Sequence, residues 1–210
     1  MKPTRIAELL RPFIGDSEVS PTLLEQLQLY LEFLVRWNAR INLTAVRDPE
    51  QIVTRHFGES LFAARILFPQ DRDVTHCTLA DFGSGAGFPG IPTKLWAPHI
   101  ELILIESQNK KATFLREMLR ALKLERVHVF AGRADDWDKC VDVVTLRAVE
   151  RFEKALPLAA RLLRPGGRLC LLIGSKQLET VRKLLGDPWT WDEAHPVPQS
   201  TERIVAIARS

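Results

Sequence analysis

The chain has 210 residues, enough for one α/β domain with its own core and a modest extension. Its formal net charge of +3 permits an acidic or nucleic-acid partner without demonstrating one. No apolar run approaches the roughly 18 residues of a membrane span, and no leader-like segment opens the chain. The odd number of widely spaced cysteines indicates neither a disulfide framework nor a metal site. We therefore expect a cytoplasmic protein whose cysteines (Cys77, Cys140 and Cys170) are reduced core residues.

Helical periodicity runs through residues 1 to about 68. Ser20 followed by Pro21 is a typical helix start, because serine caps the first turn and proline fits its first position. Apolar residues after this pair recur at helical spacing along one stripe. We predict an N-terminal helical extension over residues 1–70 and a larger unit over residues 71–210.

From Cys77 onward, strand patterns alternate with helix patterns. Short apolar strands are expected at 77–82, 100–105, 127–131, 141–146 and 169–173, and helices at 108–124 and 150–163. A turn at 164–167, a last helix near 176–185 and strands near 189–194 and 203–208 would complete seven strands. Such alternation predicts a mostly parallel sheet covered by helices.

A glycine loop, Gly83–Phe88 (GSGAGF), follows the first predicted strand. Glycine lets the backbone turn tightly and lie against a ligand, because it has no Cβ atom. A dinucleotide fingerprint, G-x-G-x-x-G, would need glycine where Phe88 stands, which disfavours a nicotinamide-dependent dehydrogenase. The pattern acidic-x-G-x-G-x-G, beginning at Asp81, is instead the first motif of S-adenosylmethionine (SAM) methyltransferases.

An acidic residue closes the next predicted strand, where a carboxylate can accept hydrogen bonds from both hydroxyls of a ribose. Glu106 stands there, near the spacing of about 20 residues expected between a glycine loop and a ribose-binding acid. Alternatively, Glu106 only supplies negative charge to the N-terminus of the following helix, and the two roles are compatible. The paired motifs predict a Rossmann-like, class I SAM-dependent methyltransferase fold.

Further segments extend these motifs over roughly residues 30–175. They include WNARINLT, RDPE and HFGESL at residues 37–44, 47–50 and 56–61, the glycine loop continued to Pro92, ES at 106–107, KK at 110–111, FL at 114–115 and LRA at 146–148. In this combination the chain resembles the RsmG (GidB) family, whose members methylate N7 of a guanine in 16S ribosomal RNA. The resemblance implies this activity, SAM as the cofactor, and 16S rRNA or the small ribosomal subunit as the partner.

The resemblance also implies a set of cofactor-binding residues. These are Gly83, Phe88, Ala134, Asp135 and Arg147, to which the sequence motifs add Gly85 and Glu106. Asp135 could accept a hydrogen bond from the adenine amino group. Arg147 follows a buried strand, so we expect its guanidinium at the carboxyl edge of the sheet, where open α/β sheets bind ligands. A surface ion pair is the alternative for Arg147.

The sequence lacks the devices that other base methylations need. Cytosine C5 methylation uses a cysteine nucleophile, usually after proline, and none of the three cysteines follows a proline. Methylation of exocyclic amino groups usually needs an Asp/Asn-Pro-Pro-aromatic loop after the fourth strand, where Leu146–Ala148 stand. Guanine N7 carries a free lone pair and needs no general base. We therefore predict no catalytic acid or base and no metal.

Candidates for the mouth of the site are Asn42, Arg47 and His56, although His56 could equally be a hydrogen-bonded structural residue. Trp37 could stack on a base, but its place on an apolar stripe favours packing. An arginine fork onto O6 and N7 would cover the reacting atom, so we expect the guanine to be held by its other edge and by stacking. We also expect it to be splayed out of the RNA.

Basic residues are frequent along the helical extension and along the helix after Glu106. They are Arg36, Arg40, Arg47, Arg55 and Arg65, then Lys110, Lys111, Arg116, Arg120 and Lys123. These side chains could bind phosphates, but solvated faces with local ion pairs explain much of the same pattern. RNA binding therefore depends mainly on the resemblance.

Two other functions would share the cofactor residues. One is methylation of a small molecule or protein, against which the segment 37–61 argues. The other is a non-catalytic ribosome assembly factor, against which the intact glycine loop, Glu106 and Arg147 argue. The chain departs from the family pattern at Ile173, where many members have lysine, and Lys176 is the nearest cation. Glu59 stands where aspartate is usual, and we expect a monomer.

Overall fold

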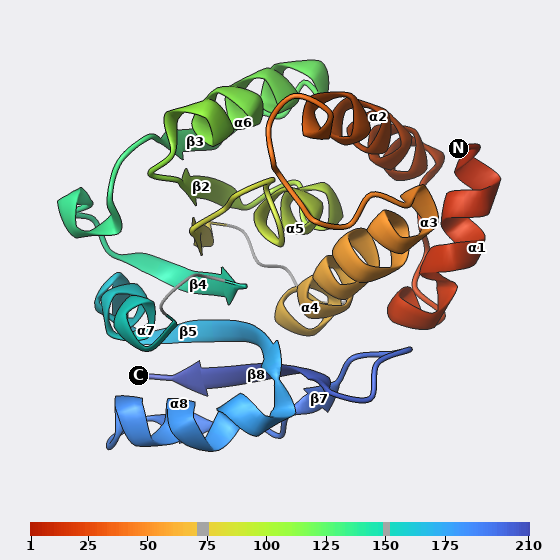
Figure 1. Cartoon of the computed structure of the whole chain (residues 1–210). Coiled ribbons are helices and arrows are strands. Elements are labelled where there is room, and N and C mark those ends of the chain that lie inside the picture. The colour runs from red at the N-terminus through yellow and green to blue at the C-terminus, as the bar shows by residue number, and fades with distance from the viewer. Residues whose placement is uncertain (71–75, 149–151) are drawn as a thin grey trace.

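The structure is a computed structural model that describes residues 1–70, 76–148 and 152–210 (Figure 1). Its helices are α1 (Pro3–Ile14), α2 (Pro21–Asn38), α3 (Pro49–Ile52), α4 (Glu59–Leu67), α5 (Gly90–Trp96), α6 (Asn109–Ala121), α7 (Phe152–Arg161) and α8 (Leu178–Leu185). A π-helical turn (Val53–Gly58) joins α3 to α4, and short 3-10 turns span Ala134–Asp136 and Ser175–Gln177. The strands are β1 (Thr78–Phe82), β2 (Glu101–Ile105), β3 (Val127–Phe130), β4 (Val141–Arg147), β5 (Leu163–Gly174), β6 (Thr190–Trp191), β7 (His195–Pro196) and β8 (Arg203–Arg209).

The strands form one sheet in the order β3-β2-β1-β4-β5-β8-β6, and β7 pairs with β8. The pairs from β3 to β5 are parallel, whereas β8 runs antiparallel to β5. The chain order reverses between β1 and β4, and in such sheets the crevice at the carboxyl ends of these strands binds ligands. The predicted α/β fold is confirmed, with seven strands along the main path and the two-residue β7 as an additional eighth.

Helices cover both faces of the sheet (Figure 1). On one face Leu79 packs in a core with Ile91 of α5 and with residues of α1, α2, α4 and α6. On the other face Ala80 packs in a second core with Leu156 of α7 and Val181 of α8. Successive strand residues point to opposite faces, so a strand buried on both sides is a continuous apolar run. This double burial fixes the sheet edge that carries the site.

The start of α2 follows the sequence prediction. The Ser20 hydroxyl accepts a hydrogen bond from the Leu23 amide at 3.1 Å, and Pro21 opens the helix. Trp37 packs against Phe114 of α6, with ring centroids 5.7 Å apart, which agrees with the packing interpretation. α2 is thereby held against the helices that cover the sheet.

The prediction of helix throughout residues 1–68 was too broad. Residues 39–48 form neither helix nor strand, because the buried Asn38 side chain satisfies backbone groups of this loop that a helix would otherwise pair. The core under α1 to α4 is continuous with the core under the sheet. A division of the chain at residue 70 stays a prediction, and residues 71–75 lie outside the described part.

The late strands differ most from the prediction. β5 begins at Leu163 and not near residue 169, and residues 164–167, expected as a separate turn, form a bulge within it. Gly166 has a φ of 76°, which suits this local turn. The expected strand at 189–194 is reduced to the two-residue β6. Of the expected helix at 150–163, residues 150 and 151 lie outside the described residues.

Cys77 and Cys170 are free and buried as expected, but Cys140 is exposed, so its placement in the core was wrong. Within the described ranges, no helix combines the length and the apolar character needed to cross a membrane.

Candidate functional site

The glycine loop turns sharply away from the end of β1. Gly83, Gly85 and Gly87 have φ angles of 68°, 56° and 91°, in the left-handed region that side chains with a Cβ rarely adopt. The following helix, α5, begins at Gly90, so Phe88 lies in the loop just before it. The spacing of the glycines is therefore a backbone requirement of this turn.

Contacts from two distant segments pin the loop. The Ser84 amide donates to the carbonyl of Ile105 at 3.0 Å, and the buried Tyr30 hydroxyl of α2 donates to the carbonyl of Ala86. A Cβ atom built on Gly85 would meet only the carbonyl oxygen of Gly83, at 3.8 Å. Gly85 therefore borders open space, which leaves room for a ligand against the backbone.

Glu106 follows β2 and is 5% exposed. Its Oε2 accepts a hydrogen bond from the Gly85 amide and its Oε1 accepts one from the Gln108 amide, each at 2.8 Å. Gln108 is the N-cap of α6, so the carboxylate serves the helix N-terminus and the glycine loop together. Each oxygen keeps a further lone pair, which can accept a hydrogen bond from a ribose hydroxyl.

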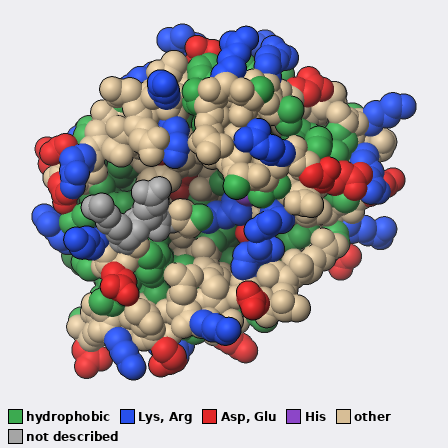
Figure 2. Space-filling model, in the orientation of Figure 1, with side chains coloured by type: hydrophobic (Ala, Val, Ile, Leu, Met, Phe, Trp, Pro, Cys, Tyr) green, Lys and Arg blue, Asp and Glu red, His purple; other side chains and the backbone are tan. Residues whose placement is uncertain are grey.

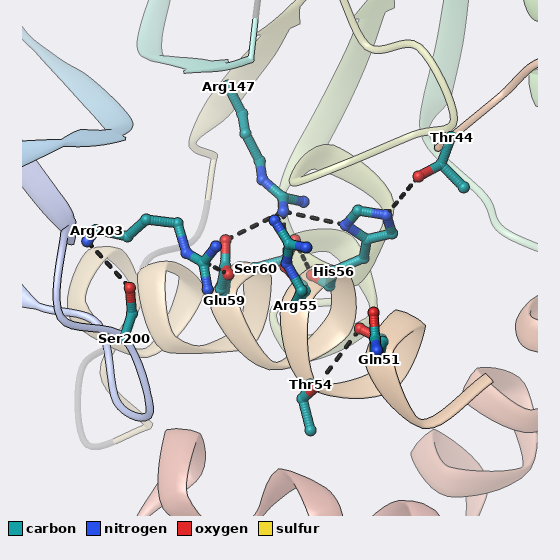
Figure 3. Close-up of polar contacts among 10 residues, drawn as sticks. All are labelled: Thr44, Gln51, Thr54, Arg55, His56, Glu59, Ser60, Arg147, Ser200 and Arg203. Carbon is teal, nitrogen blue, oxygen red and sulfur yellow. Dashed lines mark hydrogen bonds and ion pairs between the residues drawn. The ribbon is translucent and has the colours of Figure 1, made fainter. Parts of the chain in front are cut away.

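Arg147 ends β4 and points toward the π-helical turn (Figure 3). Its Nη2 lies 2.6 Å from the Arg55 carbonyl, 3.1 Å from His56 Nδ1 and 3.1 Å from Glu59 Oε2, so its two hydrogens are shared among three neighbours. The Arg147 side chain is only 12% exposed. An ion pair was the alternative expected for Arg147, but the pair is buried and not on the surface.

The Glu59 carboxylate lies between two guanidinium groups. Its side chain is 3% exposed, with Oε2 3.1 Å from Arg147 and Oε1 2.8 Å from Nε of Arg203. Burial raises the pKa of Glu59, and Arg147, Arg203 and Arg55 oppose that shift. Buried charges are tolerated when they are paired in this way. The pairs join α4, β4 and β8, which are distant in sequence, beside the glycine loop.

His56 is neutral, with both ring nitrogens engaged. Nδ1 lies 3.1 Å from Arg147 Nη2, which can only donate, so we assign the proton to Nε2, which then donates to Thr44 Oγ1 at 2.7 Å. Burial, followed by the charge of Arg147, lowers the pKa of His56 to about 3. The ring centroid lies 4.9 Å from that of Phe88, which in turn stacks on Tyr30 at 5.2 Å. The structural interpretation of His56 fits these contacts.

These groups line a pocket of about 500 Å³ at the carboxyl edge of the sheet. Figure 2 shows this face hollowed near its centre, with Lys and Arg side chains around the hollow. The structure brings together in this pocket Gly83, Gly85, Phe88, Glu106, Arg147 and His56. Within the described ranges, no group of three or more His, Cys, Asp or Glu side chains could hold a metal ion.

Four candidates do not line this pocket. Ala134 and Asp135 lie in the turn after β3 and line a separate cavity of about 160 Å³. Asn42 and Arg47 are exposed on the 39–48 loop, whose residues 43–45 line the pocket. The functional roles of these four residues stay predictions.

Two further residues of the site, Thr44 and Asn38, were not predicted from the sequence. Thr44 lines the pocket, and Asn38 holds it through a hydrogen bond from the Thr44 amide at 3.0 Å and one to the Thr44 carbonyl at 2.9 Å. Both residues lie in the segment 37–44 that resembles the family. That likeness was the available signal, but it does not separate pocket residues from supporting ones.

Comparisons with known proteins agree with this geometry. The family described as rRNA small subunit methyltransferase G (GidB) matches residues 23–195. Ribosomal RNA small subunit methyltransferase G of Xanthomonas euvesicatoria pv. vesicatoria is 41% identical over 170 residues, covering 80% of this chain and 76% of that protein. The protein of the same name from Desulfitobacterium hafniense is 38% identical over 170 residues, covering 78% of this chain and 68% of that protein.

A solved structure shows the same fold at low sequence identity. M. jannaschii TYW2, solved in complex with AdoMet, superposes with a TM-score of 0.58 at 16% identity, covering 81% of this chain and 78% of that chain. The class I methyltransferase fold expected from the glycine loop and Glu106 is thus confirmed. By the match over residues 23–195 and the identity to its relatives, the chain belongs to the rRNA small subunit methyltransferase G (GidB) family.

Proposed function

We propose that this enzyme transfers the methyl group of SAM to N7 of a guanine in 16S ribosomal RNA. The names of its relatives support methylation of small-subunit ribosomal RNA. The observation that carries the proposal is the Glu106 carboxylate, held by the Gly85 and Gln108 amides beside a glycine loop that opens onto the pocket. A ribose acceptor next to exposed backbone is what a nucleoside cofactor requires.

Different pocket residues would contact different parts of the cofactor. Glu106 accepts the ribose hydroxyls, the Gly83–Gly85 backbone lies against the amino-acid part, and Arg147 offers a guanidinium to its carboxylate. Phe88, stacked on Tyr30 and 5.9 Å below the Arg147 guanidinium, gives that end a rigid apolar floor. Ala134 and Asp135 remain the proposed adenine contacts. When bound, SAM supplies a methyl group activated by its positively charged sulfur.

The titratable groups around the pocket favour a nucleophile that needs no general base. His56 has no free nitrogen, and both oxygens of Glu106 accept backbone hydrogen bonds. Glu59 is paired with two arginines. Guanine N7 attacks with its own lone pair, and the carbon–sulfur bond breaks with its electrons left on sulfur. No proton is transferred, so orientation and the exclusion of water are the protein's contributions.

We propose 16S rRNA or the small ribosomal subunit as the partner and the cytoplasm as the location, with the enzyme acting as a monomer. Arg47 and Asn42 are exposed on the loop beside the pocket, and Lys111 lines the pocket. Ile173 is buried, so an RNA contact in that region would come from the exposed Lys176. The helical segment over residues 1–70 would carry much of the RNA surface.

Nucleoside analysis of 16S rRNA tests the proposal in cells. The 16S rRNA from a strain that lacks the gene should lack one 7-methylguanosine, and the intact gene should restore it. A gene carrying Gly85→Val should not restore it, because the loop can no longer accept the cofactor. Unchanged 7-methylguanosine in the deletion strain would contradict the assignment of the methylated atom.

A further inference from the structure

Hydrogen bonds hold both the backbone and the hydroxyl oxygen of Thr44, although this residue lies in a loop. The buried Asn38 side chain accepts from its amide at 3.0 Å and donates to its carbonyl at 2.9 Å. Its Oγ1 lies 2.7 Å from His56 Nε2 and 3.1 Å from the Val46 amide. Thr44 also lines the pocket. A loop side chain held this firmly at a pocket wall is suited to recognition.

The neighbours of His56 indicate its tautomer. Because Arg147 can only donate, we assign the tautomer in which His56 Nδ1 accepts and His56 Nε2–H donates to Thr44 Oγ1. The Val46 amide also donates to this oxygen, which uses both of its lone pairs. With this tautomer, no hydrogen bond of residues 1–70, 76–148 and 152–210 takes the Thr44 hydroxyl hydrogen. Thr44 is therefore a donor without an acceptor at the pocket wall.

We propose that the Thr44 hydroxyl donates a hydrogen bond to O6 of the target guanine and thereby selects guanine at the methylated position. This inference rests on the proposed function. Adenine carries an amino group in place of O6, so two donors would face each other. A single hydroxyl on O6 leaves the N7 lone pair open, unlike the arginine fork that covers both atoms.

The substrate is the better partner for this donor than the cofactor. The cofactor-facing groups come from the ends of β1, β2 and β4, whereas Thr44 comes from the segment before β1. Within the proposed cofactor site, Glu106 is matched to the ribose hydroxyls and Arg147 to the carboxylate. A neutral hydroxyl is left, and it complements the neutral carbonyl oxygen of a base.

A cycle of enzyme and substrate changes tests the contact. Single-turnover methylation by the wild type and by Thr44→Val is measured on 16S rRNA carrying either guanine or 2-aminopurine at the target position. 2-Aminopurine keeps N7 and lacks O6. The wild type should lose about tenfold or more in rate with 2-aminopurine, whereas Thr44→Val should lose little further. Equal losses for both enzymes would overturn the inference.

The cycle separates recognition from structural damage. Thr44→Val also leaves the His56 Nε2–H and the Val46 amide without an acceptor, so a lower rate alone would not identify the contact. Thr44→Ser keeps the hydroxyl and should restore the sensitivity to O6. Should Thr44→Val fail to fold, the wild type still decides, because full-rate methylation of 2-aminopurine would overturn the inference.

Two further results distinguish the contact to O6 from a contact to SAM and from the proposed function. SAM affinity of Thr44→Ser, measured by calorimetry, should match that of the wild type. A loss of SAM affinity in Thr44→Val without any loss of sensitivity to O6 would assign the hydroxyl to the cofactor and overturn the inference. Failure of the wild type to methylate the guanine RNA would contradict the proposed function itself, whereas methylation with additive losses overturns the inference alone.

Discussion

At the scale of single residues, the pocket depends on backbone groups as much as on side chains. Glu106 is oriented by two amides, and Arg147 is anchored in part by the carbonyl of Arg55. Backbone partners do not change with side-chain substitution, so they hold the functional groups in one geometry. Such fixed groups bind a ligand without paying to order themselves.

Replacing Gly85 with valine should abolish SAM binding. Gly85 has a φ of 56°, which strains a β-branched residue, and its missing Cβ faces open space where the ligand would lie. We expect calorimetry to detect no binding at SAM concentrations that saturate the wild type. Gly186→Val is the matched control, because Gly186 has a φ of 63° at the end of α8 and no neighbouring atom within 4 Å of its Cβ position. Equal loss of affinity in both variants would attribute the effect to backbone strain.

His56 should make the protein less stable in acid. Burial and Arg147 lower its pKa from 6.5 to about 3, so unfolding takes up a proton in this window. The stabilising contribution is complete above pH 6.5 and is lost as the pH falls toward 3. His56→Gln cannot titrate and should show a flatter decline of Tm between pH 7 and pH 4.

A matched pair of histidine variants checks this assignment. Asp81, whose pKa burial raises to about 6, has the opposite slope, but it is common to all the proteins compared. His128→Gln changes a side chain that is 68% exposed and should keep the wild-type profile. Parallel Tm profiles for His56→Gln and the wild type would show that His56 is not the group responsible.

The residues of local motifs were predictable, and those held by distant contacts were not. The glycine loop and Glu106 could be recognised because their spacing along the chain encodes one turn and one strand end. The role of Asn38 depends on the path of the loop that it holds. The Thr44 donor depends on Arg147, which is far away in sequence and sets the tautomer of His56. No spacing rule connects those positions.

At the scale of elements, the π-helical turn joins the N-terminal helices to the sheet. Its residues supply the Arg55 carbonyl and the His56 ring to Arg147, and Glu59 begins the next helix. π-helical turns occur often at functional sites. The sequence predicted helix here, but the periodicity of side chains does not distinguish this turn from an α-helix.

Replacing Glu59 with glutamine should destabilise the fold strongly. The variant leaves Arg147 and Arg203 close together without the carboxylate between them. Removing one member of a buried ion pair costs about 3 kcal/mol or more, which denaturant titration can measure. Glu50→Gln breaks the exposed pair with Arg5 and should leave the denaturation midpoint almost unchanged. A midpoint for Glu59→Gln that equals that of Glu50→Gln would contradict the structural role of the network.

The element boundaries that failed have local physical causes. The bulge at residues 164–167 keeps β5 paired with β4 on both sides of a turn that the sequence indicated as an interruption. Proline lacks the amide hydrogen that strand pairing needs. Pro188 and Pro198 stand close to β6 and β7, and each of these strands has only two residues. Turn residues were therefore recognised correctly, while their place within or between strands was not.

At the scale of the whole molecule, the pocket and the 39–48 loop lie at the same edge of the sheet. α8 lies on the other side of the molecule from α2 (Figure 1). None of the described residues that line the pocket belongs to α8. We therefore predict that charge changes near the pocket affect RNA binding more than equal changes on α8.

Arg47→Ala should weaken RNA binding and leave SAM affinity intact. If Arg47 contacts one phosphate, the slope of log affinity against log salt should fall by about one. Lys183→Ala, on the exposed face of α8, should keep the wild-type slope. Equal slopes for all three proteins would remove Arg47 from the RNA surface.

The central claim is tested most directly by methyl transfer from labelled SAM to small ribosomal subunits, and separately to their protein-free RNA. Both substrates are prepared from cells lacking the enzyme, and the product nucleoside is identified. The account predicts stoichiometric 7-methylguanosine at one position in 16S rRNA with at least one substrate, and none with Gly85→Val. Intact SAM binding with no transfer to either substrate would contradict the account.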